Sequence, residues 1–418
     1  IENAPSKAAQ ILEALLEKYP HEQSAYAELV RAYTFLTDYK KATQTELRAL
    51  QSDSLDKTMW NSLAYSYAGL DRRKEALEAV DKYLRLAPGE PNPYDSKGEI
   101  HFVFGEIDSA SHWFQKAVSF RSDFVTIEKL GYHALLRQDY ERAERYFQQF
   151  GSTSDRFQKA RAEIDLASIP SHRGQLRQAQ TQMLRNLSSH RNQKLQGDVI
   201  DDDYLMLALL AYETGDYSDM LEYSKTRTIE LKQDPTELIY GRDLLAWAWL
   251  KSGSARTSSE IMRRLEDDIR GTLPGLQVRY DYASALLAYE EGRYDVAVEK
   301  FRSALRLLYP NHAPQFHYAV SLLKTGRVSD AIDELQRATW WSPISFPPLS
   351  LSFLPTWANW PIAAVKAHFW LGVAYERKGE KENAIEEYEK FLNLWKDADE
   401  GLPEILDAKK RLAALKRE

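Results

Sequence analysis

The sequence contains no cysteine and no long apolar run. With no cysteine among its 418 residues, the chain can form no disulfide, no thiolate metal site and no thiol nucleophile. Its longest apolar stretch, 204–212, is far shorter than the roughly 20 residues that a helix needs to cross a bilayer. We therefore expect this segment to be soluble, and the composition leaves both the cytoplasm and the periplasm open as its compartment.

An excess of basic residues is also missing. The chain has 62 acidic and 55 basic side chains, which gives a net charge of −7, and no stripe of alternating aromatic and basic residues is present. Nucleic-acid binding draws much of its affinity from cations that contact phosphates. We therefore expect no nucleic acid as a direct partner.

The sequence motifs of common catalytic sites are absent as well. The chain has no Gly-rich phosphate loop, no H-E-x-x-H, no G-x-S-x-G and no H-R-D followed by D-F-G, and its nine histidines are scattered singly. The acidic residues Asp198 and 201–203 lack the spacing of a calcium loop, so we interpret them as carboxylates that cap the N-terminus of a helix. The sequence thus predicts a non-catalytic chain with no metal and no cofactor.

The most informative feature that is present is a segment that recurs about every 34 residues. Its large residues would wedge between two antiparallel helices, its small residues would let the helices cross closely, and its final proline would end the second helix. The clearest copy consists of Trp60, Leu63, Ala64, Tyr67, Ala76, Val80, Tyr83 and Pro88. This spacing predicts a helix-turn-helix repeat.

The pattern resembles that of the tetratricopeptide repeat (TPR) family. Four consecutive copies in phase begin at Gln23, Lys57, Pro91 and Phe124, and another strong copy begins near Val365. The resemblance implies an all-α fold, a right-handed superhelical solenoid of about ten helix-turn-helix repeats with a C-terminal capping helix. Five further helix pairs, longer and weaker in pattern, are marked by expected turn glycines at Gly174, Gly215, Gly253, Gly292 and Gly326.

The repeats suggest a domain plan for the whole chain. An array over 23–343 has strong copies over 23–150 and degenerate copies over 151–343, and it is followed by a Pro/Trp-rich insertion over 344–364, a repeat over 365–398 and a capping helix over 399–418. Residues 1–22 fit only the second half of a repeat. We therefore expect the chain to be a piece of a longer protein, with an upstream domain missing.

The resemblance also implies where a partner would bind, since the first helix of each repeat lines the concave face. In the first half of the chain the inward positions are polar, and they include Asn61, Tyr65, Asp95, Glu99 and Tyr132. In the second half they are mostly aromatic, and they include Tyr212, Trp247, Tyr282, Tyr289, Phe316 and Phe369. The alternative is that the aromatic side chains belong to the core, because an aromatic stripe at helical spacing commonly does.

A subclass of such repeats that holds acidic C-terminal tails of chaperones needs Lys, Asn and Arg at defined first-helix positions. At the matching positions this sequence has Ala27 and Arg31, then Asn61 and Tyr65, and then Asp95 and Glu99. The last two residues would repel an acidic tail. We therefore do not expect a role as an Hsp70 or Hsp90 co-chaperone.

The stretch 340–361 interrupts the array with five prolines and four tryptophans. Proline removes a backbone donor and fixes φ, so an extended path is expected instead of a helix pair. Three interpretations remain open: a plug or lid over the concave groove, an exposed docking element, or local packing against its own repeat. The aromatic residues concerned are Trp340, Trp341, Phe346, Phe353, Trp357 and Trp360.

The last repeat and the tail show a second resemblance. They look like the TPR tails of bacterial multidomain regulators, of the serine/threonine kinase or winged-helix type, through Phe391, Leu392, Trp395, Lys396, Asp397, Ala398, Asp399, Leu402, Pro403 and Glu404. This resemblance implies an output domain upstream in the same polypeptide.

Together these patterns predict a non-catalytic scaffold for protein–protein interaction, or a regulatory TPR module of a larger bacterial protein, that binds a protein or peptide in its concave groove. Two alternatives remain. The chain could be a permanent structural subunit of an assembly, or a small-ligand sensor that uses the aromatic groove.

Overall fold

The computed structural model describes residues 4–122, 124–230, 235–270, 274–307, 316–340 and 361–417. These residues form 22 helices, and they contain no β-strand. The first half comprises α1 (Ala4–Lys18), α2 (Gln23–Phe35), α3 (Tyr39–Ser52), α4 (Lys57–Gly69), α5 (Arg73–Leu86), α6 (Pro91–Val103), α7 (Ile107–Phe120), α8 (Thr126–Leu136), α9 (Tyr140–Phe150), α10 (Arg156–His172) and α11 (Leu176–Asn192).

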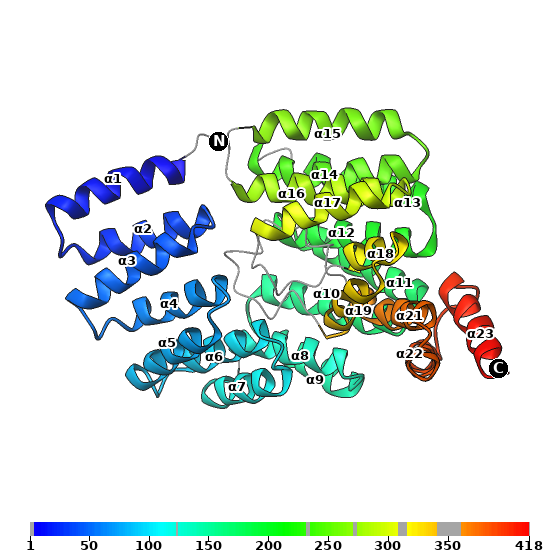
Figure 1. The fold of residues 1–418 in the computed structure, drawn as a ribbon, viewed down its shortest axis with the longest axis horizontal. Helices are drawn as coiled ribbons and strands as arrows, with labels where there is room; N and C mark the ends of the chain where they lie inside the picture. Colours follow the sequence, from blue (N-terminus) through cyan, green and yellow to red (C-terminus); the bar gives the residue numbers. More distant parts are fainter. Residues whose placement is uncertain are drawn as a thin grey trace.

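The second half contains several longer helices. It comprises α12 (Asp198–Thr214), α13 (Tyr217–Glu230), α14 (Pro235–Lys251), α15 (Ala255–Ile269), α16 (Pro274–Glu290), α17 (Tyr294–Leu307), α18 (Phe316–Lys324), α19 (Val328–Ala338), α21 (Pro361–Lys378), α22 (Lys381–Leu394) and α23 (Pro403–Leu415). Among the described helices, ten antiparallel pairs run from α2–α3 to α21–α22, with α1 before them and α23 after them. The fold is therefore the expected all-α solenoid, and Figure 1 shows the pairs following a curved path.

Each helix pair turns through one residue with positive φ. The ten residues are Thr37, Asp71, Gly105, Gln138, Gly174, Gly215, Gly253, Gly292, Gly326 and Gly379. Glycine adopts this left-handed conformation without strain, whereas threonine, aspartate and glutamine do so at a cost. The five turn glycines that were predicted in the weaker copies are confirmed, with φ between 73° and 85°.

The small residues of the repeat pattern have a direct packing role. A Cβ atom added to Gly98 would lie 2.5 Å from the ring of Phe114 on the paired helix, and one added to Gly372 would lie 2.5 Å from the ring of Tyr388. These distances are shorter than carbon atoms tolerate. The pairing of glycine in the first helix with an aromatic ring in the second therefore sets the close crossing of the two helices.

Contacts between distant parts of the chain tie the solenoid together. Phe35, at the end of α2, packs against a buried cluster of α14–α16 that includes Met262. The Trp340 ring, just after α19, meets the Phe102 ring of α6 edge-on at 5.9 Å and lies against Gly105 in the α6–α7 turn. Sequence periodicity gives no sign of either contact.

A third long-range contact joins the α22–α23 loop to the α10–α11 turn. Trp395 Nε1 donates a hydrogen bond to the His172 carbonyl oxygen at 3.1 Å, and the Asp399 amide donates to the Gly174 carbonyl oxygen at 3.0 Å. The Asp399 carboxylate in turn accepts from the Arg177 amide at 2.9 Å. These contacts dock the C-terminal end of the array on its middle.

Candidate functional site

The residues that the repeat places on the inner face form a row of polar contacts between successive first helices. The Tyr65 hydroxyl of α4 donates to Glu99 of α6, and the Lys129 ammonium of α8 lies between Glu99 and Asp95, 2.8 Å from Asp95 Oδ1. Burial raises the pKa of Glu99 to about 7, although the neighbouring Lys129 opposes this shift. Lys129 thus joins three of the predicted site residues in one buried cluster.

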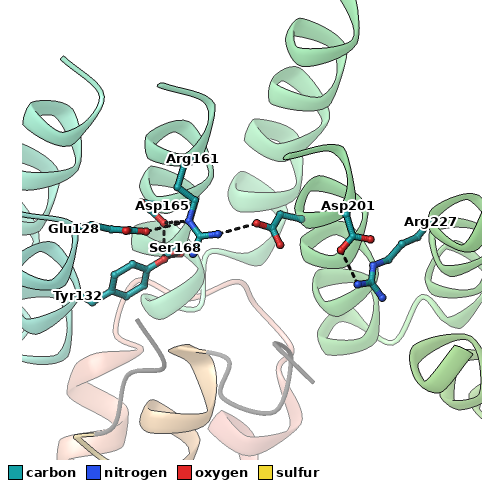
Figure 2. Close-up of polar contacts among 8 residues, drawn as sticks. Glu128, Tyr132, Arg161, Asp165, Ser168, Asp201 and Arg227 are labelled. Atoms are coloured by element: carbon teal, nitrogen blue, oxygen red, sulfur yellow. Dashed lines mark hydrogen bonds and ion pairs between the residues drawn. The ribbon is translucent and has the colours of Figure 1, made fainter. Parts of the chain in front are cut away.

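The row continues from α8 to α10 and α12, as Figure 2 shows. The Tyr132 hydroxyl donates to Asp165 Oδ1 at 2.8 Å, and Arg161 lies 3.0 Å from Glu128 Oε1 and 2.8 Å from Asp202 Oδ2. Burial, followed by repulsion from Glu128, raises the pKa of Asp165 well above its usual range. Tyr132, another predicted site residue, is therefore held by a neighbouring helix pair.

The acidic group at the start of α12 takes part in similar contacts. Asp201 pairs with Arg227 of α13 at 2.7 Å (Figure 2), and Asp203 Oδ2 lies 2.7 Å from His190 Nδ1 of α11. The N-cap position is occupied by Gly197, where no side-chain cap bond forms. The helix begins at Asp198, so the acidic group lies at its N-terminus as expected, but Asp201 and Asp203 pair with the adjacent helices instead of capping the helix.

In the second half, an aromatic and acidic cluster surrounds Glu290 of α16. Its Oε1 accepts hydrogen bonds from the Tyr212 hydroxyl at 2.9 Å and from Trp247 Nε1 at 3.1 Å, and its Oε2 lies 2.8 Å from Lys251 Nζ. The Tyr212 and Trp247 rings lie 4.4 Å apart between centroids, and Trp247 is only 2% exposed. These contacts fix two of the predicted aromatic residues against α16.

The other predicted aromatic residues also pack within the array. Tyr282 is 0% exposed and lies against Phe301, whereas Tyr289 is half-buried against His317. Phe316 and Phe369 are both buried. The structure thus gives each of these rings a packing role, and their contact with a partner stays a prediction.

Sequence reasoning missed the cations of this row. Lys129, Arg161 and Lys366 were not among the predicted site residues, yet Lys366 of α21 lies 2.6 Å from both Glu213 of α12 and Glu404 of α23. A signal was available for the first two, because Lys129 is separated from Asp95 by 34 residues and Arg161 from Glu128 by 33, which is about one repeat in each case. Opposite charges at equivalent positions of successive repeats indicate such a contact.

Near the N-terminus the same face is more open. Ala27 and Arg31 of α2 occupy the repeat positions of Asn61 and Tyr65 in α4, and both are exposed. Asn61 is half-buried, and its Oδ1 atom has no hydrogen-bond partner in the part of the chain that the structure describes. Thr58, at the start of α4, is exposed too. This surface, formed by Ala27, Arg31, Thr58 and Asn61, is here named the N-terminal inner face.

Of the aromatic residues predicted in the insertion, the structure describes Trp340, which is half-buried. The other five, Trp341, Phe346, Phe353, Trp357 and Trp360, lie outside the described residues. Most of the segment that the plug, docking and local-packing interpretations concern also lies outside the described residues. These interpretations therefore stay predictions.

The described residues offer neither a metal site nor a membrane-spanning helix. Their histidine, aspartate and glutamate side chains form no group of three or more that is arranged to hold a metal ion. None of the described helices combines the length and apolar character that crossing a membrane requires.

A buried carboxylate beside the N-terminal inner face leads to a pH prediction. Glu46 of α3 is 0% exposed, its Oε1 accepts from Ser62 Oγ at 2.5 Å and from Ser66 Oγ at 3.0 Å, and burial raises its pKa from 4.5 to about 7. An acid whose folded pKa is raised contributes stability that is present below its unfolded pKa and is lost as the pH rises through the folded pKa.

The free energy of unfolding of the wild type is therefore expected to fall between pH 4.5 and pH 8. Glu46→Gln should make this fall about 1–3 kcal/mol smaller. Urea unfolding followed by circular dichroism at both pH values measures this difference. Glu141→Gln, at an exposed position of α9, is the matched control and should leave the pH dependence as it is. If Glu46→Gln keeps the wild-type pH dependence, Glu46 does not titrate in this range.

Comparison with known proteins identifies the repeats. Models described as tetratricopeptide repeat match residues 58–90, 282–342 and 365–394. TPR repeat-containing protein MJ1428 of Methanocaldococcus jannaschii is 29% identical over 136 residues, which cover 32% of this chain and 24% of that protein. The chain therefore contains tetratricopeptide repeats, as the sequence pattern predicted.

Other similarities are more limited. Peptide chain release factor 1 of Oceanobacillus iheyensis is 36% identical over 98 residues, which cover 23% of this chain and 25% of that protein. The chain thus spans about a quarter of the length of both curated relatives. Among solved structures, yeast Tom70 aligns over 99% of this chain and 92% of its own, with 13% identity and a TM-score of 0.42. Cut9–Hcn1 aligns over 99% and 81%, with 13% identity and a TM-score of 0.44.

Proposed function

We propose that this tetratricopeptide-repeat solenoid is a non-catalytic protein-binding module that holds a protein or peptide partner on its inner face. We place the contact on the N-terminal inner face, where Ala27, Arg31 and Thr58 are exposed. The proposal also includes the prediction that the binding face continues through Tyr212, Trp247 and the other aromatic residues. Because Tyr282 and Trp247 are almost completely buried, the proposed contact in this region rests on the partly exposed Tyr212 and Tyr289.

The observation that supports the proposal best is the row of polar contacts between first helices. Tyr65 contacts Glu99, Asp95 contacts Lys129, and Tyr132 contacts Asp165, each across one repeat. Such contacts fix the spacing of successive first helices before any partner arrives. A surface that is already ordered loses less conformational entropy on binding, so a fixed row of repeats favours the binding of an extended partner.

The chemistry of the open surface indicates what kind of partner fits. The Oδ1 atom of Asn61 is shielded from water, so the polar group that Asn61 offers to a partner is its Nδ2 amide. A backbone carbonyl oxygen of an extended peptide is a suitable acceptor for it. The net charge of −7 favours a peptide that carries basic residues. The acidic side chains Asp95 and Glu99 farther along the face are already paired with Lys129.

We further propose that the module belongs to a larger bacterial protein with an output domain upstream. The resemblance of 391–404 to the tails of bacterial regulators supports this proposal. The same segment also has a structural role here, since Trp395 and Asp399 dock on the α10–α11 turn. A search for catalytic or DNA-binding activity in the full-length gene product tests whether an output domain is present.

Blocking the N-terminal inner face is expected to weaken partner binding strongly without unfolding the chain. Ala27→Arg adds a long cationic side chain at an exposed helical position, so it should cost little stability yet repel a basic peptide and obstruct the face. The partner is first captured with the intact gene product from its host and identified. Isothermal titration calorimetry with the purified partner then measures the affinity.

The control for this experiment is the same substitution elsewhere. Ala413 is exposed on α23, so Ala413→Arg adds an equal charge away from α2. We expect Ala27→Arg to weaken binding at least about 30-fold, which corresponds to roughly 2 kcal/mol, and Ala413→Arg to leave it unchanged. Equal affinity for both variants would place the partner on another surface.

A further inference from the structure

A pocket of about 340 Å³ opens among α13, α14 and α15, and it takes no part in the row of polar contacts on the inner face. Its volume lies at the lower end of the range that is usual for small-molecule sites. Because a water molecule takes about 30 Å³ in the liquid, the pocket has room for a group of roughly ten heavy atoms. It is lined by Lys225, Thr228, Ile229, Arg242, Leu245, Ile261 and Arg264.

The walls of the pocket combine apolar side chains with cations. Ile229, Leu245 and Ile261 supply the apolar surface, and Ile229 is 59% exposed although it belongs to a helix that packs on both neighbours. A single exposed isoleucine is common on protein surfaces. An isoleucine that borders a concave apolar surface, however, contributes hydrophobic binding energy when a ligand covers it. The apolar part of the pocket therefore favours a hydrocarbon group.

The cations of the pocket are incompletely neutralised. Arg264 has no ion pair in the part of the chain that the structure describes, and Lys225 lies over the ring of Trp249 at 5.0 Å instead of beside a carboxylate. Arg242 contacts Asp268, but Asp268 is not among the lining residues. Among the described residues that line the pocket, none is acidic.

The proximity of two guanidinium groups adds an electrostatic argument. Burial and then repulsion from Arg264 lower the pKa of Arg242. An anion between Arg242 and Arg264 would remove this repulsion and would accept hydrogen bonds from both guanidinium groups. Such charge-assisted hydrogen bonds are about twice as strong as neutral ones.

From this arrangement we propose that the pocket among α13, α14 and α15 binds a small amphiphilic carboxylate, whose head group is held by Arg264 and Arg242 and whose hydrocarbon chain lies against Ile229, Leu245 and Ile261. A divalent cation would be repelled by the three basic side chains. An inorganic anion alone would leave the apolar wall uncovered. The site is separate from the N-terminal inner face, so this proposal does not depend on partner binding there.

Decanoate is a suitable probe because its carboxylate and its chain match the size of the pocket. We expect decanoate to bind the intact chain in isothermal titration calorimetry and to raise its thermal unfolding temperature. Decanol, which has the same chain without the charge, should bind at least about ten-fold more weakly, since it forms no charge-assisted hydrogen bond. Equal affinity for decanol and decanoate would contradict a role for the cations.

Two matched variants of α15 locate the binding. Arg264→Met removes an exposed cation that lines the pocket, whereas Arg256→Met removes an exposed cation of the same helix that pairs with Glu260 and is not among the lining residues. Circular dichroism checks that both variants keep their helical content. Arg264→Met should weaken decanoate binding at least about ten-fold and leave decanol binding unchanged, and Arg256→Met should change neither.

Two results would overturn the proposal. One is an absence of decanoate binding by the wild-type chain. The other is decanoate binding that Arg264→Met and Arg256→Met affect equally, which would place the ligand elsewhere on the molecule. A loss of both decanoate and decanol binding in Leu245→Asp, with unchanged helical content, would support the assignment of the apolar wall.

Discussion

Lys129→Met is expected to lower the free energy of unfolding by about 3–5 kcal/mol, because it leaves the buried carboxylates Asp95 and Glu99 without their cation. Both carboxylates are almost completely shielded from water, so neither can recover the lost interaction by hydration. Tyr65 would still donate to Glu99 and Thr126 to Asp95, but two neutral hydroxyls do not compensate two charges. Urea unfolding at pH 8, followed by circular dichroism, measures the effect.

A combined variant separates the charge effect from the loss of side-chain packing. Lys129→Met together with Asp95→Asn and Glu99→Gln removes all three charges, and replacing a complete buried ion cluster by neutral groups is commonly much less costly than breaking it. We expect this triple variant to recover most of the lost stability. Lys57→Met, which breaks an exposed ion pair with Glu90, should have little effect.

The opposite ranking, with the triple variant less stable than Lys129→Met, would contradict the explanation. It would mean that the shape of the lysine stem and its contacts matter more than its charge. The row of polar contacts would then not depend on charge at this position, and the argument that it fixes the spacing of the first helices would lose its main support.

Trp395→Ala is expected to cost about 3–5 kcal/mol and to reduce the cooperativity of unfolding. Trp395 is buried, its ring lies 5.1 Å from that of Phe391, and its Nε1 atom donates to the His172 carbonyl oxygen 223 residues away. In an ordinary repeat array each repeat contacts only its neighbours. This contact instead couples α21–α23 to α10 and α11, so its loss should let the C-terminal helices unfold separately.

Hydrogen exchange measured by mass spectrometry tests this prediction for each helix. In Trp395→Ala, amides of α21–α23 should exchange faster than those of α2–α9, whereas in the wild type the two groups should differ less. Trp395→Phe keeps most of the packing and loses one hydrogen bond, so it should cost only about 1 kcal/mol. If Trp395→Ala instead accelerates amide exchange equally over the whole chain, this result would contradict the local role of the contact.

The helix pairs could be predicted because their signals are local and repeated. Gly174 and Gly326 mark turns that require positive φ, and Gly98 opposite Phe114 shows why small and aromatic residues alternate between the paired helices. Turns at Thr37 and Gln138 carry no such glycine. At these two turns, the register of the neighbouring repeats predicted where the turn lies.

The inner face was harder to predict, since the sequence gives the direction of a side chain but not what already occupies the space beside it. Asp95 and Glu99 both pair with Lys129, and this buried cation between them was not expected, because lysine is rarely buried. Contacts such as Trp340 with Phe102 or Trp395 with His172 follow from the curvature of the whole array. No periodic pattern in the sequence encodes them.

The most direct test of the central claim, that the partner lies on the inner face, is site-specific photocrosslinking of the complex. A photoreactive amino acid is placed singly at the exposed inner positions Ala27 and Thr58, and at the exposed position Lys74 of the second helix α5. The account predicts crosslinks to the partner from Ala27 and Thr58 and none from Lys74. Crosslinks from Lys74 alone would contradict it and would place the partner on the outer face of the solenoid.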